Sequence, residues 1–395
     1  MPWKVSQLVS ERMKLILRIE HGESMSDLCR EFGISRKTGY KFLDRYQRYG
    51  VDGLSDQIRS PITRPFKTPE SVEQKVLELK ARYPDWGARK IRERLGSAEQ
   101  LGMPIPHAIT VHRILRRHGK VEVKKQRRAN PAFRSEKIRS TENPNEIWCL
   151  DFKGQFRVKD GQLCYPLTLS DHFSRYLLLC ESLEGTQSKP AEIALREAFE
   201  NYGLPSAILS DNGCPFGSRG IFGLSRISLF FMRLDIDVLR IEPGHPEQNG
   251  RHERMHLTLK RATTRPAGAN LLQQQERFDK FMREFNEERP HEALAMKTPS
   301  EIWKPPTRKM PQEIPEPDYK NEDLIRYVSN FGLVNLRKGK AFHLSSAFVD
   351  QPVALTEVEE NLWRVKFMNY ELGFVDELTG KFKPNMHLTL SPVSC

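Results

Sequence analysis

Three acidic residues in the middle of the chain have types and positions that suit metal-assisted phosphoryl chemistry. Asp151 ends an apolar, strand-forming run, Asp211 directly follows a second such run, and Glu253 lies in a predicted helix. Carboxylate oxygens are the ligands that Mg²⁺ and Mn²⁺ prefer. Two such ions, about 4 Å apart, could contact both the attacking and the leaving oxygen of a phosphodiester. The three acids therefore predict a site for two metal ions.

The third acid has two candidates, because Glu247 and Glu253 both follow Asp211, with 35 and 41 residues between. Glu247 directly follows a proline and would lie in the first turn of the helix. A carboxylate there complements the helix dipole, which is a sufficient structural reason for it. Glu253 would lie more than a turn deeper, with Lys260 seven residues further on and on the same face. We therefore choose Glu253.

A mixed α/β domain would bring these acids together. The residue patterns predict three strands followed by alternating helices and strands. The predicted strands are 146–152, 163–170, 176–181, 206–210 and 238–241, and the predicted helices are 190–202, 220–233 and one from about 247. This order indicates a sheet that starts with three meandering antiparallel strands. If the first and fourth strands are parallel neighbours, Asp151 and Asp211 meet at one edge of the sheet. A further helix, 269–288, is expected to pack against this core through Leu272, Phe278 and other apolar residues.

The chain is basic, since its 395 residues include 63 lysines and arginines against 51 acidic residues, a net charge of +12. Between residues 111 and 139, 11 basic residues stand against two acidic ones. A solvated tether is the alternative, but a tether gains nothing from such one-sided charge unless a polyanion lies along it. The stretch therefore predicts a basic linker that follows nucleic acid.

Composition excludes several other classes of protein. An apolar fraction of 38% with 29% charged residues is typical of globular domains rather than disordered chains. Every stretch long enough to span a membrane, about 20 residues, contains charge. The first residues do not resemble a signal peptide, so we expect a cytoplasmic protein. The six scattered cysteines form no CxxC pair, which argues against a disulfide framework and a zinc ribbon.

Two helical modules are predicted before the linker. In the first, two short helices, a turn at Gly33 and a third helix outline a helix-turn-helix. Basic side chains of the third helix share one face, beside an apolar stripe of Phe42, Tyr46 and Tyr49. An ordinary amphipathic helix with a solvated basic face is the alternative. In the second module Thr68 would be the N-cap and Pro69 the first helical residue, with later helices at 87–95 and 108–118.

The last region alternates in period two and predicts a small antiparallel β-barrel after a Pro-rich connector. The expected architecture is therefore multidomain: all-α helix-turn-helix modules, a central α/β core and a C-terminal all-β barrel. The predicted boundaries are 1–60 and 65–120 for the helical modules, 121–142 for the linker, 143–300 for the core, 301–320 for the connector and 321–395 for the barrel.

Three motifs carry a family resemblance. Residues 148–154, 210–216 and 243–255 resemble the catalytic motifs of retroviral-integrase-like transposases, above all the four-eight-one family of bacterial insertion sequences. The resemblance continues through 285–294 and, more weakly, the N-terminal module. It implies a ribonuclease-H-like core and a catalytic acid triad, carried over to Asp151, Asp211 and Glu253. The sequence departs from many relatives, which place 35 residues between the last two acids, because 217–228 holds extra residues. The zinc-binding N-terminal module of retroviral integrases is not evident.

Two other functions compete with this interpretation. Residues 252–256 match the HExxH pattern of zinc metalloproteases. Glu276 is the candidate for the third zinc ligand, although no spacing pattern requires it. That hypothesis leaves Asp151 and Asp211 unexplained, so His252 and His256 are interpreted as DNA-facing or packing residues. A non-catalytic DNA-binding regulator would explain the charge but not the acids.

The hypothesis is a DNA transposase with two Mg²⁺ or Mn²⁺ ions per active site, held by Asp151, Asp211 and Glu253. It would bind the terminal inverted repeats of an insertion sequence, hydrolyse the phosphodiester at the 3′ ends and join the 3′-hydroxyl to target DNA. The expected partners are double-stranded DNA and further copies of the chain, as a homodimer or larger synaptic complex, in the cytoplasm of a bacterium at the nucleoid. The predicted DNA-binding residues are Arg36, Lys37, Lys41, Arg45, Arg48, Arg113, Arg116, Arg117, Lys124, Lys125, Arg127, Arg128, Asn212, Arg251 and Lys260.

Overall fold

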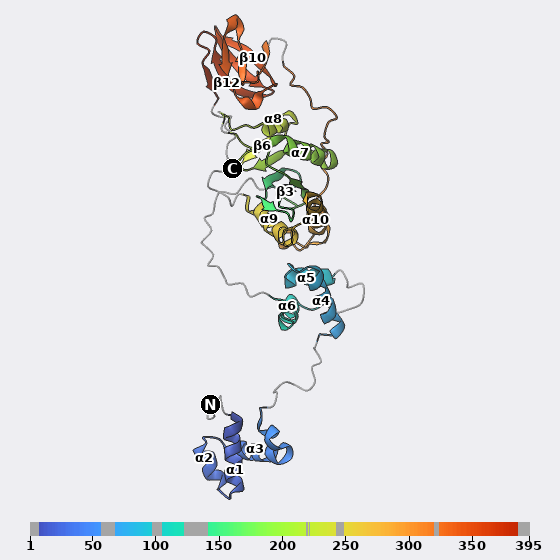
Figure 1. Ribbon diagram of the computed structural model, residues 1–395, viewed down its shortest axis with the longest axis vertical. Helices are drawn as coiled ribbons and strands as arrows, with labels where there is room; N and C mark the ends of the chain where they lie inside the picture. Colours follow the sequence, from blue (N-terminus) through green and yellow to red (C-terminus); the bar gives the residue numbers. More distant parts are fainter. Residues whose placement is uncertain are drawn as a thin grey trace. The chain divides into compact units, whose positions relative to one another are not determined.

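The computed structural model divides the chain into two compact units, Met1–Thr68 and Pro69–Cys395. The structure describes residues 8–56, 68–96, 105–121, 141–218, 220, 222–241, 249–319 and 324–385. The hinge predicted at 60–65, most of the basic linker and Glu247 lie outside these residues. Figure 1 shows the helices and strands of both units.

The first unit is a helix-turn-helix, as predicted. It contains α1 (Leu8–Glu20), α2 (Met25–Glu31), α3 (Arg36–Tyr49) and the 3₁₀ turn η2 (Gly50–Leu54). Gly33 turns the chain at a φ of 64°, and the Ser35 hydroxyl caps α3 by accepting from the Thr38 amide. A side chain at Gly39 would meet two sulfur atoms of α2 at 2.7 Å, so glycine permits the close packing of α3 on α2. Tyr49 is 62% exposed and does not join the predicted apolar stripe, because it lies in the last turn of the helix.

The second helical module opens the second unit. It contains α4 (Glu70–Arg82), α5 (Ala88–Gly96) and α6 (Ala108–Arg117) around a core that includes Trp86 and Ile114. Pro69 has a ψ of 145°, which is not helical, so it takes the N-cap position. Helix α4 therefore begins one residue later than predicted.

A mixed sheet forms the central domain. Its strands are β1 (Ile147–Phe152), β2 (Phe156–Arg157), β3 (Leu163–Asp171), β4 (Leu177–Leu183), β5 (Ala207–Ser210) and β6 (Asp237–Arg240). The sheet runs β2-β3-β1-β5-β6, with β4 paired to β3. β1, β3 and β4 are antiparallel neighbours, while β1–β5 and β5–β6 are parallel pairs. The predicted antiparallel meander with a parallel extension is confirmed, and so is the ribonuclease-H-like class of the core.

Helices cover the two faces of this sheet. Trp148 and Leu150 point into an apolar cluster with α7 (Ser188–Tyr202) and α8 (Arg226–Arg233), whereas Leu177 and Cys180 of β4 pack with α9 (Gly250–Thr263) and α10 (Leu271–Arg283). Side chains alternate along a strand, so Asp151 lies on the face opposite to Leu150. That is the face on which α9 packs.

Two predicted helix starts are wrong. Helix α8 begins at Arg226 rather than near 220, because the Ser225 hydroxyl accepts from the Ser228 amide in a capping box. Helix α9 begins at Gly250 rather than near 247, with Asn249 at the N-cap position. Glu253 consequently lies in the first turn of α9, not a turn deeper.

The chain after α10 holds the outer strand of the sheet. A π-helical segment, η5 (Glu284–Glu288), follows α10, and the buried side chain of Asn286 bonds both the amide and the carbonyl of Leu177, at 2.8 and 2.9 Å. The 3₁₀ turn η6 (Glu292–Leu294) and helix α11 (Pro299–Ile302) follow. Leu272 is 74% exposed, so its predicted packing is wrong, whereas Phe278 is buried.

The C-terminal region is all-β, as predicted. A five-stranded antiparallel sheet runs in the order β13-β12-β11-β10-β7, and β8 and β9 form a separate pair. Their bounds are Leu324–Tyr327 (β7), Leu333–Asn335 (β8), Ala341–His343 (β9), Pro352–Glu359 (β10), Leu362–Phe367 (β11), Tyr370–Asp376 (β12) and Phe382–Pro384 (β13). No helix in the described part of the chain is long and apolar enough to cross a membrane.

Candidate active site

The strand register brings Asp151 and Asp211 to the same edge of the sheet. In the parallel pairing of β1 with β5, Leu150 lies opposite Ser210. Asp151 and Asp211 are the next residues along these two strands. Asp151 is the next-to-last residue of β1, and Asp211 directly follows β5. Open α/β sheets bind ligands beyond the carboxyl ends of their strands. The two aspartates therefore lie at the same edge of the sheet, as expected from parallel neighbouring strands.

The surroundings of Asp151 favour a nearby positive charge. Burial raises the pKa of Asp151 to about 7, and the negative charges of Asp211 and Glu253 contribute to the rise. All three predicted acids thus interact electrostatically. The Oδ1 atom of Asp211 is buried and has no hydrogen-bond partner among the described residues. A divalent cation would satisfy this oxygen and offset the repulsion between the carboxylates, so the donor set fits Mg²⁺ or Mn²⁺.

The most compact group of possible metal ligands differs from the predicted triad. In the described part of the chain it consists of Asp151, His252 and His256, whose ligand atoms lie within 4.8 Å of one another. Asp211 and Glu253 lie outside this group. The triad assignment accordingly stays a prediction.

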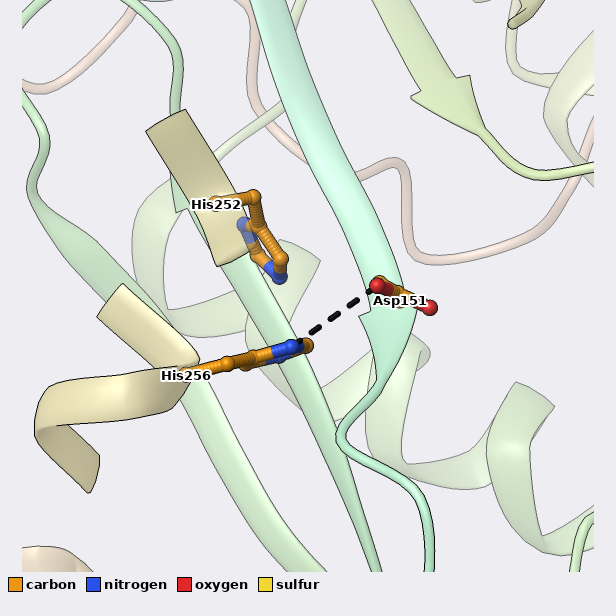
Figure 2. Close-up of side chains that lie close together, drawn as sticks. All are labelled: Asp151, His252 and His256. Atoms are coloured by element: carbon orange, nitrogen blue, oxygen red, sulfur yellow. Dashed lines mark ion pairs between the residues drawn. The ribbon is translucent and has the colours of Figure 1, made fainter. Parts of the chain in front are cut away.

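Both histidines pack under the sheet beside Asp151, as Figure 2 shows. His252 and His256 are 2% and 5% exposed, and their Nε2 atoms lie 2.8 and 2.7 Å from the Thr168 hydroxyl. Burial lowers the pKa of His252 to about 3 and that of His256 to about 2. The 3.8 Å contact of His256 Nδ1 with Asp151 Oδ2 therefore joins a neutral imidazole to a carboxyl group.

This packing favours one of the two roles predicted for the histidines, that of packing residues. Contact of either histidine with DNA stays a prediction. A zinc protease would need their nitrogens free for the metal, whereas both Nε2 atoms already bond Thr168. The third residue beside them is Asp151, not Glu276.

The turn that carries Asp211 depends on two glycines. A Cβ atom at Gly213 would lie 2.9 Å from Asp211 Oδ2, and one at Gly217 would lie 2.5 Å from the Asn212 carbonyl oxygen. The contact at Gly217 is with backbone and leaves no room for a side chain, whereas the contact at Gly213 would require the Asp211 carboxylate to move. The Asn212 amide donates to the Ile241 carbonyl at 2.9 Å, so it ties the ends of β5 and β6 together. The predicted contact of Asn212 with DNA stays a prediction.

Arg240 of β6 supports this turn, and the sequence analysis did not identify it. Its guanidinium is buried and donates to the Ser210 hydroxyl at 2.5 Å and the Asp211 carbonyl at 2.8 Å. It also donates to the Phe216 carbonyl and the Ser228 hydroxyl. A lone arginine at the end of an apolar strand was the available signal, but its nearness to the Asp211 turn arises only from the pairing of β5 with β6.

Lysines lie near the acids. Burial and the charge of Lys260 lower the pKa of Lys153, while Asp151 and Glu253 oppose this shift. Lys153 and Lys260 line one small cavity of about 70 Å³ at this edge. The predicted Lys260 thus has a second cation beside it, and Lys153 was missed although it lies two residues after Asp151.

The predicted DNA-binding residues of the helical modules have different surroundings. Arg36, Lys37, Lys41 and Arg48 of α3 are exposed, and Arg48 pairs with Asp44 of the same helix. On α6, Arg113 and Arg116 are exposed, while Arg117 pairs with Glu73 at 2.5 Å. Arg45 is half-buried near the Phe42 ring. The linker residues Lys124, Lys125, Arg127 and Arg128 lie outside the described residues. DNA contact by any of these residues stays a prediction.

Comparison with known proteins agrees with this architecture. Two models of the integrase core domain match residues 141–246 and 234–299, a helix-turn-helix domain matches 11–62, and a homeodomain-like domain matches 38–115. An uncharacterized 31.7 kDa protein of insertion element IS407 from Burkholderia multivorans is 23% identical over 63% of this chain and 87% of its own length. These matches support a bacterial insertion-sequence transposase with an integrase-like core. The narrower assignment to the four-eight-one family stays a prediction.

Viral proteins are similar to parts of the transposase. The Gag-Pol polyprotein of baboon endogenous virus is 30% identical over 31% of the chain, which spans only 7% of that polyprotein. The HTLV-2 integrase catalytic core in complex with magnesium is 20% identical and covers 41% of the chain and 99% of its own, with a TM-score of 0.33. A chain of the simian T-cell lymphotropic virus intasome in complex with PP2A regulatory subunit B56 gamma is 18% identical over 75% of this chain and 97% of its own, with a TM-score of 0.37.

Proposed function

We propose that the transposase hydrolyses the phosphodiester at the 3′ ends of its insertion sequence and joins the freed 3′-hydroxyl to target DNA. Asp151, Asp211 and Glu253 are the catalytic carboxylates in this proposal. The observation that carries it is the parallel register of β1 and β5, which sets two aspartates side by side at the sheet edge. The influence of Asp211 and Glu253 on Asp151 supports the inclusion of the third acid.

The carboxylates would hold two Mg²⁺ or Mn²⁺ ions, one mainly on Asp151 and Asp211 and the other shared with Glu253. When bound, these ions supply Lewis-acid stabilisation of the attacking and leaving oxygens. The buried, unpartnered Oδ1 of Asp211 and the mutual repulsion of the acids support metal binding here.

Other residues would hold and orient the DNA. Lys153 and Lys260 flank the acids and can contact the phosphate next to the cleaved bond, and Arg251 can contact a neighbouring phosphate. Arg240 is a positioning residue, because it holds the turn that carries Asp211. The helix-turn-helix modules would recognise the terminal inverted repeats, and two chains would act together on the two ends. We place this activity in the bacterial cytoplasm, at the nucleoid.

The test is a cleavage and joining assay with the full chain, Mg²⁺ and a labelled duplex that carries a candidate element end. We expect nicking at the 3′ terminus and joined products. Asp151→Asn, Asp211→Asn and Glu253→Gln should each reduce product formation at least 1,000-fold, on the order of the effects of removing a central catalytic group. Duplex binding should persist in all three variants.

Glu247→Gln is the matched control, because Glu247 is the other candidate for the third acid. It should retain most of the parent activity. Loss of activity in Glu247→Gln with activity retained in Glu253→Gln would reassign the third ligand. A parent protein that binds the duplex but never nicks it would instead support a non-catalytic regulator.

A further inference from the structure

A large cavity lies beside α9, next to the predicted acids. Its volume is about 830 Å³, within the range of roughly 300–1,000 Å³ that pockets for whole organic ligands occupy, and larger than one inorganic ion needs. Its walls come from the start of α9, the turn between β3 and β4, the segment after α10, and Lys90 of α5. Its lining includes Asp171, His172, Arg175, Arg251, Arg289 and His291.

Positively charged guanidinium groups crowd one side of this cavity. Arg175 and Arg251 both donate to the carbonyl oxygen of His172, Arg251 at 3.4 Å. Burial and the charge of Arg251 lower the pKa of Arg175 to about 10. Two like charges that share one acceptor repel each other, so a bound anion would stabilise the pair.

Two acids of the cavity wall have partners of their own, while Glu284 and Asp85 act on Arg289 electrostatically without an ion pair among the described residues. Asp171 accepts from the Asn145 amide at 2.7 Å and from the Ser174 amide and hydroxyl at 2.7 and 2.6 Å, which holds the turn. Glu292 pairs with Arg89 at 3.2 Å. Within the described ranges, no carboxylate lies within 4.0 Å of the guanidinium of Arg175, Arg251 or Arg289.

The histidines of the cavity respond to the same positive potential. Burial lowers the pKa of His172 to about 3, and Arg251 and Arg175 contribute. Burial likewise lowers the pKa of His291 to about 3, and Lys90, Arg289 and Arg175 contribute. The Nε2 atom of His291 is buried without a partner among the described residues. Both imidazoles are therefore neutral, and the positive charge of the cavity resides on its arginines and Lys90.

We infer that this cavity binds phosphodiester groups of the DNA strand that passes the active site, with Arg175 and Arg289 as ligands that the sequence analysis did not identify. Planar guanidinium groups match the oxygens of a phosphate in pairs. Glu253 lies in the cavity wall, so a strand at the acids can continue into it. This inference rests on the proposed function, because it assumes that DNA lies across the predicted acids.

The test measures how the affinity of the full chain for a fluorescent duplex of random sequence depends on salt. The variant combines Arg175→Asn, since asparagine tolerates the φ of 67° at this position, with Arg289→Gln. Each lost phosphate contact reduces the slope of log K against log salt by about 0.9, so the expected reduction is about 1.8. Arg289→Gln alone, which leaves the β3–β4 turn intact, should reduce it by about 0.9.

Two controls match this change in charge. Lys189→Gln with Arg226→Gln removes two exposed charges from α7 and α8, which cover the other sheet face, and should leave the slope unchanged. Arg175→Lys with Arg289→Lys keeps both charges and should preserve most of the slope. An unchanged slope in Arg289→Gln and in the double variant would overturn the proposal.

The outcome separates this inference from the proposed function. If the double variant reduces the slope but the parent protein never nicks its element end, only the proposed chemistry is contradicted. If the parent protein nicks its element end but the slope of the variants is unchanged, only the inference about the cavity is contradicted. Stabilisation of the parent protein by millimolar inorganic phosphate, lost in the double variant whose DNA slope is unchanged, would make the cavity a small-anion site and overturn the assignment to DNA.

Discussion

At the scale of single residues, burial sets the protonation of the groups around the predicted acids. It raises the pKa of Asp151 and lowers those of His172, His252 and His256. In each case the neutral form is favoured, because an apolar surrounding disfavours charge. The histidines thus serve as hydrogen-bonding parts of the core. Protonation of their imidazoles at low pH should destabilise the folded protein.

His172 gives a prediction of pH dependence. Its pKa is about 3 in the folded chain and about 6.5 when unfolded, so the unfolded state binds more protons between these values. Stability from this group is complete above pH 6.5 and is lost as the pH falls toward 3. His172→Gln should reduce the slope of the free energy of unfolding against pH by up to the contribution of one proton, about 1.4 kcal/mol per pH unit.

Urea unfolding at pH 4, 5, 6 and 7 measures this slope. His343→Gln, at an exposed position of β9, is the control and should keep the parent slope. If His172→Gln also keeps the slope of the parent protein, the His172 imidazole does not cause the pH dependence.

At the scale of elements, the acids depend on how neighbouring strands are joined. Asp151 and Asp211 come from strands far apart in sequence, and the parallel pairing of β1 with β5 makes them neighbours. The turn after β5 is then held from β6, where one buried arginine bonds four acceptors around Asp211. The geometry of the site is consequently sensitive to a residue that does not touch substrate.

Arg240→Met should therefore destabilise the protein. It leaves the Ser210 and Ser228 hydroxyls and the Asp211 and Phe216 carbonyls without their donor, and loss of one partner in a buried charged network costs about 3–5 kcal/mol. Urea unfolding at pH 7 measures the change. Arg226→Met, an exposed arginine at the start of α8, should change stability by less than about 0.5 kcal/mol. Equal effects of the two substitutions would contradict the positioning role of Arg240.

At the scale of the whole molecule, the chain consists of two units with separate cores. In the first unit, Leu15 packs with Leu28, and Ile16 packs with Phe42 and Leu54. The buried guanidinium of Arg12 bonds the Leu54 carbonyl at 2.6 Å and closes this unit on its own η2 turn. A unit with its own core can fold independently of the rest of the chain.

The fragment 1–68 should accordingly fold alone. We expect a helical circular dichroism spectrum and a cooperative thermal transition, near the temperature of a separate transition in the full chain. Phe42→Ala should remove the transition from both, because it deletes the central side chain of a small core, at a cost of about 3–5 kcal/mol. A fragment that stays unfolded while the full chain shows a single transition would mean that the units depend on each other.

Much of this organisation could be predicted from local patterns. The strands of the core, the helix-turn-helix outline and the all-β end follow from periodicity and turn residues, which act over a few positions. Helix starts were less predictable, because a local cap can override the hydrophobic pattern, as the Ser225 capping box does at the start of α8. The predicted candidates Asp151 and Asp211 needed only the assumption that their strands are parallel neighbours.

The sequence by itself determined which acids could act, the order of the domains and where basic charge accumulates, because residue type and spacing are local properties. Only the tertiary structure decided that His252 and His256 are buried, that Arg240 holds the Asp211 turn, and that Arg175, Arg251 and Arg289 share a cavity. Burial and counter-charge depend on residues distant along the chain, and folding alone brings those residues together.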